Sequence, residues 1–384
     1  MNAPAVRFLH TSDWQLGMPA AFLARYDDAV PAEFARARLD AVERLGEVAA
    51  ERGCAFIVVA GDVFDSNSPD PQQLGRAVER LRGLPVPAYL LPGNHDSLDP
   101  SSVYRRPEFA ELAGHGVHVI RDSAPIEVAE GVQLVGAPFR SRTPAADPVA
   151  AALAGLDRPA GIRILVGHGQ LEGFGGEALI DARALAGAVA EGVVDYVALG
   201  DRHGALEAAP RTWFSGSPEV TDFDDVEHDS GRVLVVDIAA DAAGESTLAV
   251  EPVRVGRWAF RAIDADIASD ADLDAFLARL DGLPDKDRTV VKYSLRGEVT
   301  IGQKLRLDAA LDRFRDLFAC LYRRERTFDL AVVPGDGRLP DLGLTGVPAR
   351  AAERLIAHAQ SGSDGAETAA RALRTLIRLA GKES

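Results

Sequence analysis

Five short clusters of polar residues each follow an apolar segment that is typical of a β-strand. They lie at residues 12–15, 61–65, 93–96, 167–169 and 200–203. In a sheet built from successive α/β units, the carboxyl ends of the strands share one edge, so the five clusters are expected to meet there. The sequence therefore predicts an active site at that edge.

The residue types in these clusters suit a site for two divalent cations. Carboxylates, imidazoles and a carboxamide together are the ligands that hard to borderline cations prefer. One bridging carboxylate can hold two such ions about 3.5–4 Å apart, where they clamp the attacking and leaving oxygens of a phosphate. A single cluster would be weak evidence, because an aspartate after a strand is often a helix cap. Five clusters in order favour a two-metal phosphoesterase.

Strand-like and helix-like segments alternate along the first part of the chain, which is the pattern of a layered α/β domain. The predicted strands are 5–10, 55–60, 86–91, 131–137, 162–167 and 194–199, and then 211–216, 231–238 and 247–256 without intervening helices. The predicted helices are 30–52, 71–82, 107–114, 146–155 and 181–190.

The pattern changes near residue 257 and predicts a small α+β cap. A helix is expected at 270–281, a strand at 289–295 and a longer helix at 304–320. A loop at 334–337 ends the cap, and helices at 348–360 and 366–380 follow it. The chain is therefore expected to comprise a metal-site domain at 1–256, a capping domain at 257–335 and a helical tail at 336–384.

Charge and composition limit how the protein could bind DNA. The formal net charge is −16, and the acidic excess lies in residues 1–256. A protein that binds duplex DNA by itself usually carries a basic surface, because phosphate contacts supply most of the nonspecific affinity. Cations at a carboxylate-rich site, or a partner protein, would have to supply the positive charge here.

The remaining composition indicates a cytoplasmic protein with no membrane association. Cys54 and Cys320 lie far apart, which argues against a disulfide framework and against a cysteine-based zinc site. No run of 18 apolar residues occurs, and the amino-terminal residues lead directly into a short strand.

The ordered clusters resemble the signature of the calcineurin-like metallophosphoesterases, which runs Asp-x-His, Gly-Asp-x-x-Asp, Gly-Asn-His-Asp/Glu, Gly-His and Gly-His-x-His. Within that superfamily, segments 10–17, 61–65, 93–97 and 215–218 are most similar to the nuclease subunit family of the bacterial SbcCD complex. The resemblance covers about residues 5–240. It implies an α/β fold in which helices flank a layered metallophosphoesterase β-sandwich. A small α+β cap and a C-terminal helical tail would follow.

The resemblance also implies a role for each polar residue. The first divalent metal ion would be bound by Asp13, Gln15, Asp62 and His203, and the second by Asp62, Asn94, His168 and Asp201. His95 would protonate the leaving oxygen or stabilise the phosphoryl charge. Asp96 would orient His95, as a carboxylate fixes an imidazole tautomer.

Two predicted ligands differ from the family signature. Gln15 stands where the family has a histidine, and Asp201 stands where it has the first histidine of Gly-His-x-His. A glutamine carbonyl is a weaker neutral ligand than imidazole, whereas a carboxylate binds a hard cation well. The altered set favours Mn²⁺, or else Mg²⁺, over softer metals.

Several residues beside the clusters have two interpretations. Arg202 could grip a phosphate. Arg140 and Arg142 could contact a nucleic-acid backbone, although a solvated loop is the favoured interpretation of both. Trp14 could stack a nucleotide base or pack its loop against the core. Asp65 could orient a ligand or cap its turn.

Three functions fit these observations. The leading hypothesis is a metal-dependent DNA exonuclease or endonuclease, the D subunit of an SbcCD-like double-strand-break repair complex in the cytoplasm at the nucleoid. The resemblance implies a homodimer, and implies that the C-terminal helices dock an SbcC-like SMC/ABC ATPase. The second hypothesis is a phosphodiesterase or phosphatase for cyclic or bis-nucleotides. The third is a scaffold subunit with a weakened metal site.

Overall fold

The computed structural model describes residues 4–20, 22–25, 29–174, 179–241, 245–333 and 346–359, together with 365, 368–369, 372–373 and 375–376. The chain divides into two compact units, Met1–Ala259 and Phe260–Ser384. The predicted loop at 334–337 and most of the predicted helix at 366–380 lie outside the described residues. The roles assigned to 1–256, 257–335 and 336–384 remain predictions.

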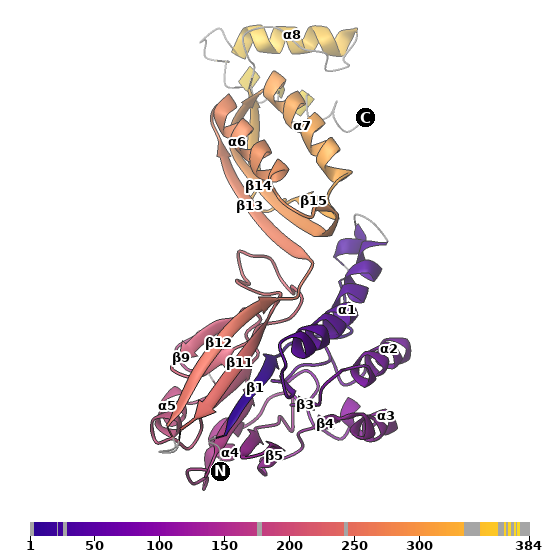
Figure 1. Cartoon of the computed structure of the whole chain (residues 1–384). Helices are drawn as coiled ribbons and strands as arrows, with labels where there is room; N and C mark the ends of the chain where they lie inside the picture. Colours follow the sequence, from indigo (N-terminus) through magenta and orange to yellow (C-terminus); the bar gives the residue numbers. More distant parts are fainter. Residues whose placement is uncertain are drawn as a thin grey trace. The chain divides into compact units, whose positions relative to one another are not determined.

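The first sheet of the first unit has the strand order β12-β11-β1-β2-β3-β4. Strands β1 to β4 run parallel, and β11 pairs antiparallel with both β1 and β12. Figure 1 shows β12, β11 and β1 side by side. The strands are β1 (Ala5–Thr11), β2 (Ile57–Val59), β3 (Ala88–Leu90), β4 (Val117–Val119), β11 (Arg232–Ala240) and β12 (Ser246–Arg254).

The second sheet has the strand order β5-β6-β7-β8-β10-β9. Its four central strands are parallel, and β5 and β9 pair antiparallel at the two edges. The strands are β5 (Ile126–Ala129), β6 (Val132–Gly136), β7 (Ile162–His168), β8 (Tyr196–Gly200), β9 (Leu206–Ala209) and β10 (Thr212–Phe214).

Side chains on alternate faces of each strand build three apolar layers. Along β1, Phe8 points into the core between the two sheets, whereas the next residue, Leu9, points into the core beneath the helices of the first sheet. The outer face of the first sheet is covered by α1 (Val30–Glu51), α2 (Pro71–Arg82) and α3 (Pro107–Leu112). The outer face of the second sheet is covered by α4 (Pro148–Leu153) and α5 (Ala182–Ala190).

The first unit is therefore a β-sandwich with helices on both outer faces, which confirms the predicted fold class. Local chemistry sets its helix starts: the Asp70 carboxylate accepts the N–H groups of Gln72 and Gln73, and Pro71 occupies the first helical position of α2. Short 3-10 turns occupy Leu23–Arg25, Val103–Arg105, Ala113–His115 and Lys286–Arg288.

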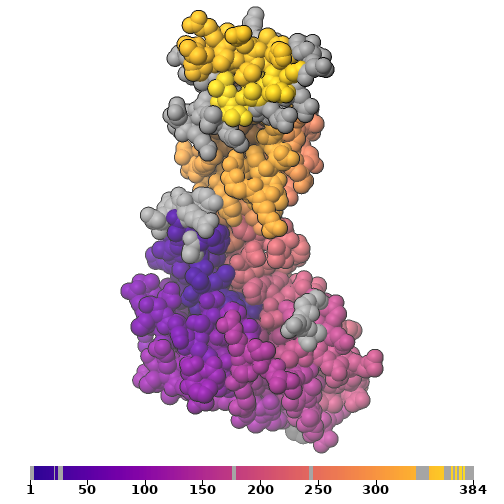
Figure 2. Space-filling view, turned by 180° about the vertical axis from the view of Figure 1, so that it is seen from behind, coloured from indigo at the N-terminus to yellow at the C-terminus, as the bar shows by residue number. Residues whose placement is uncertain are grey.

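The second unit is an α+β unit, as the sequence indicates, and its surface is orange and yellow in Figure 2. Its sheet has the order β13-β14-β15, with β16 also paired to β14. Its apolar core joins that sheet to α6 and α7. The elements are β13 (Ala259–Ile267), α6 (Asp270–Asp281), β14 (Thr289–Thr300), α7 (Ile301–Arg315), β15 (Cys320–Arg323), β16 (Asp329–Val333) and α8 (Val347–Ala359).

The predicted helix at 304–320 is shifted in the structure. Thr300 caps the helix by accepting the N–H of Gln303, whose side chain in turn accepts the N–H of Thr300, so α7 begins at Ile301. The helix ends at Arg315, and Cys320 opens a strand that pairs with β14. Cys54 and Cys320 are both buried free thiols. Among the described residues, no helix is long and apolar enough to cross a membrane.

Candidate active site

The first two polar clusters are joined through their backbones. Asp13 donates its N–H to the carbonyl of Gly61 at 3.0 Å, and Gln15 donates to the carbonyl of Asp62 at 3.0 Å. The two loops follow β1 and β2, which are parallel neighbours. Adjacent strands therefore bring the two clusters together, as predicted, although the fourth and fifth clusters arrive from the opposing sheet rather than from the same one.

The predicted ligands are concentrated at strained backbone positions. Seven non-glycine residues of the described chain have positive φ, and four of them are predicted metal ligands. Their φ values are 53° for Asp13, 50° for Gln15, 55° for Asp62 and 92° for Asp201. Such conformations cost free energy in L-residues and persist where the surrounding structure imposes them, which is typical of functional sites.

Two glycines allow the ligands to approach one another. A Cβ on Gly61 would lie 2.1 Å from Nδ1 of His168, and a Cβ on Gly93 would lie 2.2 Å from Oδ1 of Asp62. Any larger residue at either position would displace a predicted ligand. Packing at the site therefore requires both glycines, and the φ of 95° at Gly61 favours glycine there as well.

Three buried side chains form the centre of the site. Ligand atoms of Asp13, Asp62 and His168 all lie within 4.8 Å of one another, as in a metal-binding group. His168 Nδ1 lies 2.8 Å from the carbonyl of Ala60, which assigns the Nδ1 proton to that hydrogen bond. The other ring nitrogen, Nε2, faces the site and lies 3.4 Å from Oδ2 of Asp62.

On one side of this centre lie Asn94 and Asp201. The Oδ1 atom of Asn94 is 2.8 Å from His168 Nε2, and Oδ1 of Asp201 is 3.7 Å from the same nitrogen. Gln170 donates from Nε2 to Oδ2 of Asp201 at 2.6 Å and fixes that carboxylate. Gln170 was missed from the sequence, where its only signal is its position two residues after His168.

On the other side lie Gln15 and His203. Gln15 Nε2 donates to Oδ2 of Asp62 at 3.2 Å, and His203 Nε2 lies 3.9 Å from Oδ1 of Asp13. The backbone N–H of Asp201 also donates to the Asp13 carboxylate, at 3.1 and 3.2 Å. The structure thus brings all seven predicted ligands to one place, while their assignment to two separate ions remains a prediction.

Burial and neighbouring charges shift the pKa values of this cluster in opposite directions. Burial raises the pKa of Asp13 to about 6 despite the attraction of His203 and His168. Burial also acts to raise the pKa of Asp62, but the interactions with His168 and His95 together outweigh it and leave that pKa below the ordinary value. Burial opposes protonation of both histidines, yet Asp62 raises the pKa of His168 well above normal, and Glu227 and Asp13 raise that of His203 to about 8.

This donor set fits divalent cations. Buried carboxylates held close together repel one another, and a cation between them would remove that cost. The set combines carboxylate and amide oxygens with imidazole nitrogens and contains no thiolate, so it suits Mn²⁺ or Mg²⁺ better than thiophilic metals.

His95 lies beside the centre, but Asp96 does not orient it, so that prediction was wrong. The carboxylate of Asp96 accepts the N–H groups of Phe64 and Gly93 and the hydroxyl of Tyr104, at 3.0, 2.8 and 2.6 Å. Asp96 is completely buried and holds the loops rather than the imidazole.

The residue beside the His95 ring is Asp65. His95 Nδ1 lies 2.8 Å from the Asp65 backbone carbonyl and 3.9 Å from Oδ1 of its carboxylate. The backbone N–H of His95 donates to Oδ1 of Asp62 at 3.0 Å, which places this residue next to the predicted bridging ligand. The Asp65 backbone thus holds His95, which is not a predicted ligand, and the two interpretations of the Asp65 side chain stay predictions.

The contacts of the remaining candidates show which of them could reach a substrate at the site. Trp14 is buried, donates from Nε1 to Thr11 at 3.0 Å and packs in the core, so it is not available to stack a base. Arg202 is half-buried beside Asp201. Arg140 and Arg142 are exposed, and Arg140 donates to the carbonyl of Arg121 at 3.0 Å. No described contact brings either exposed arginine to the metal-site residues.

A family model described as calcineurin-like phosphoesterase matches residues 6–205. The chain belongs to the calcineurin-like phosphoesterase family. The matched segment contains every predicted ligand of this phosphoesterase site. Membership confirms the resemblance seen in the sequence and assigns the chain to hydrolases that act on phosphoesters.

Two individual proteins are similar to this calcineurin-like phosphoesterase. A DNA double-strand break repair protein Mre11 of Archaeoglobus fulgidus is 34% identical over 95 residues, which are 24% of this chain and 19% of that protein. The chain thus matches about a fifth of that relative's length. The crystal structure of calcineurin-like phosphoesterase YfkN from Bacillus subtilis is 13% identical with a TM-score of 0.37, over 66% of this chain and 92% of that chain.

Proposed function

We propose that this phosphoesterase is a metal-dependent nuclease that hydrolyses phosphodiester bonds at DNA ends. The observation that carries the proposal is the convergence of three carboxylates, two imidazoles and two carboxamides beside His95. The similarity to a protein named for DNA double-strand break repair supports DNA over other phosphodiesters.

Each residue has a proposed part in the reaction. Asp13, Gln15, Asp62 and His203 would hold one divalent cation, and Asp62, Asn94, His168 and Asp201 would hold the other. Two cations there, Mn²⁺ by preference, would neutralise phosphate charge and lower the pKa of water.

Two histidines and one arginine would bind, orient and protonate the reacting groups. His168 keeps its Nδ1 proton on the Ala60 carbonyl, so that Nε2 remains available as a ligand. His95, with Nδ1 held by the Asp65 carbonyl, presents Nε2 as the group that protonates the leaving oxygen. Arg202, next to Asp201, would bind a phosphate oxygen.

The proposal includes a protein partner and a second copy of the chain. An acidic chain is expected to bind DNA weakly by itself, so we propose that it works as the D subunit of an SbcCD-like complex with an SMC/ABC-type ATPase, and as a homodimer. Docking of the ATPase by the C-terminal helices belongs to this proposal, and so does a cytoplasmic, nucleoid-associated location.

The test is hydrolysis of end-labelled duplex DNA and of bis(p-nitrophenyl) phosphate, with Mn²⁺ or Mg²⁺, alone and with the ATPase partner. Wild type would be compared with Asp62→Asn, His95→Ala and the control Asp195→Asn. Asp195 precedes β8, at the end of the strand opposite Asp201, where it accepts the N–H of Arg163 at 2.9 Å.

Loss of DNA hydrolysis in the two site variants, with activity kept in Asp195→Asn, would support the nuclease. Cleavage of the small ester alone, with or without the partner, would favour a small-molecule phosphodiesterase. Absence of both activities together with absent metal binding would favour a scaffold subunit and refute the proposal.

A further inference from the structure

The ring of His203 is held on the side away from the metal-site carboxylates. Its Nε2 faces Asp13, whereas Nδ1 lies 2.5 Å from the hydroxyl of Thr221 and 3.3 Å from Oε2 of Glu227. Both contacts come from a segment that follows the last polar cluster by about 20 residues in the sequence and belongs to none of the five clusters. The imidazole therefore lies between a metal-site carboxylate and a second, separate carboxylate.

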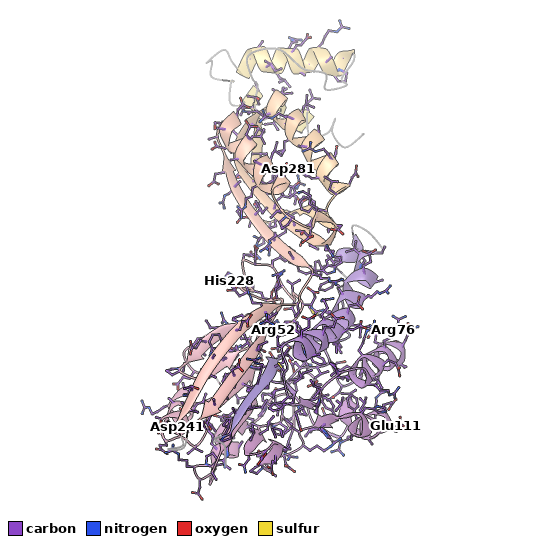
Figure 3. All side chains as sticks on the ribbon, viewed as in Figure 1. Arg52, Arg76, Glu111, His228, Asp241 and Asp281 are labelled. Atoms are coloured by element: carbon purple, nitrogen blue, oxygen red, sulfur yellow. The ribbon has the colours of Figure 1, made fainter. Side chains whose placement is uncertain are left out.

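Glu227 is itself rigidly fixed. It is buried, and its carboxylate accepts the backbone N–H groups of Thr221 at 3.0 Å and Asp222 at 3.1 Å. The Thr221 hydroxyl is hydrogen-bonded to Oε2 of the same carboxylate. A turn in which the N–H groups of Val226 and Glu227 donate to the carbonyl of Phe223 closes the segment. In Figure 3 the segment is found through the labelled His228, the residue after Glu227.

This arrangement settles which nitrogen of His203 can bind a cation. With a carboxylate and a hydroxyl at Nδ1, the proton of the neutral ring is held there, and the lone pair of Nε2 is directed toward Asp13. A carboxylate that accepts the distal N–H of a metal-binding histidine orients the ring and increases its basicity.

We propose that Glu227, assisted by Thr221, is a positioning residue that fixes the orientation and tautomer of His203 for metal binding. The inference rests on the proposed metal site. Glu227 would not touch the cation or the substrate, and its whole effect would pass through His203.

The test measures Mn²⁺ affinity by calorimetry and by electron paramagnetic resonance of the free ion, in Glu227→Gln, His203→Ala and the double variant. The matched control is Glu219→Gln, because Glu219 is also buried and also accepts two backbone N–H groups, those of Arg257 and Trp258. Nitrogen-15 spectra of metal-free protein, taken above the His203 pKa of about 8 so that this ring is neutral, report which ring nitrogen carries the proton.

We expect Glu227→Gln to weaken one Mn²⁺ site by about 10–100-fold, as is usual when the partner of a metal-binding histidine is changed. Glu219→Gln should leave the affinity unchanged. In the His203→Ala background the Glu227 substitution should add nothing, because residues that act through one another are not additive. The ring spectra of Glu227→Gln should show loss of the Nδ1-protonated form of His203.

The outcomes distinguish a failure of the metal site from a failure of the positioning role alone. If His203→Ala does not weaken Mn²⁺ binding, the proposed metal site is wrong and the inference fails with it. If His203→Ala weakens binding but Glu227→Gln does not, or if the two effects are additive, only the positioning role is refuted. Should Glu227→Gln fail to fold, Thr221→Val decides: weaker Mn²⁺ binding supports the link, and unchanged binding overturns it.

Discussion

Replacing Asp13 by asparagine should have opposite effects on stability in the absence and presence of metal. Asp13 is completely buried, and burial raises its pKa from 3.8 to about 6. A carboxyl group whose pKa is higher in the folded state makes the protein most stable below the unfolded pKa. That stability is lost as the pH rises from about 4 to about 6.

The size of the effect follows from the shift. A change from 3.8 to about 6 corresponds to ~3 kcal/mol, since one pKa unit is about 1.4 kcal/mol. Asparagine cannot ionise, so the metal-free variant should gain ~3 kcal/mol relative to wild type between pH 4 and pH 7. The hydrogen bond that Asp13 accepts from Ser12 acts to lower this pKa and is already included in the shift.

Urea unfolding with a chelator present, at half-unit steps from pH 4 to pH 8, measures this difference. A parallel series with saturating Mn²⁺ should reverse the order, because wild type gains about 4 kcal/mol at 1,000 times the dissociation constant and the variant gains less. Parallel pH profiles of wild type and variant without metal would refute the reasoning, because Asp13 would then titrate normally in the folded protein.

Three further predictions concern the same site. His95→Asn should lower the turnover of phosphodiesters by about 10²–10⁴-fold while Mn²⁺ affinity is unchanged, as assays of both would show; weaker metal binding would contradict an acid role. Mn²⁺ binding at pH 7 should release protons, because the raised pKa values of His168 and His203 keep both rings protonated without metal. Calorimetry in buffers of different ionisation enthalpy measures this release, and its absence would contradict those shifts. Gln15→His should raise the preference for Zn²⁺ over Mn²⁺ in competition titrations, and an unchanged ratio would show that Gln15 is not a ligand.

The sequence predicted the central features of the fold because burial and strand-end chemistry leave local signals. The clusters at strand ends predicted that the seven side chains gather, and the resemblance to the calcineurin-like metallophosphoesterases implied the sandwich. The short strand β5 and the edge strand β9 were missed, because both are only partly buried and so lack a clear apolar pattern.

The contacts between loops could not be predicted from spacing. The position of Asp96 next to His95 in the sequence favoured it as the orienting residue. Only the folded loops show that Tyr104 and two backbone N–H groups occupy the Asp96 carboxylate. Glu227 lies beside His203, and Gln170 donates to Asp201. Neither contact follows from the spacing or the periodicity of the sequence. Such supporting residues become visible only when three-dimensional neighbours are known.

The antiparallel pairing of β1 with β11 also constrains the order in which the protein can fold during synthesis. β1 is made well before its antiparallel partner, Arg232–Ala240, which leaves the ribosome only after every predicted ligand has been made. Until then one edge of β1 is unpaired and can associate with other strands. We expect nascent chains that stall before residue 232 to be prone to aggregation, and the ligand loop after β1 to become ordered only late in synthesis.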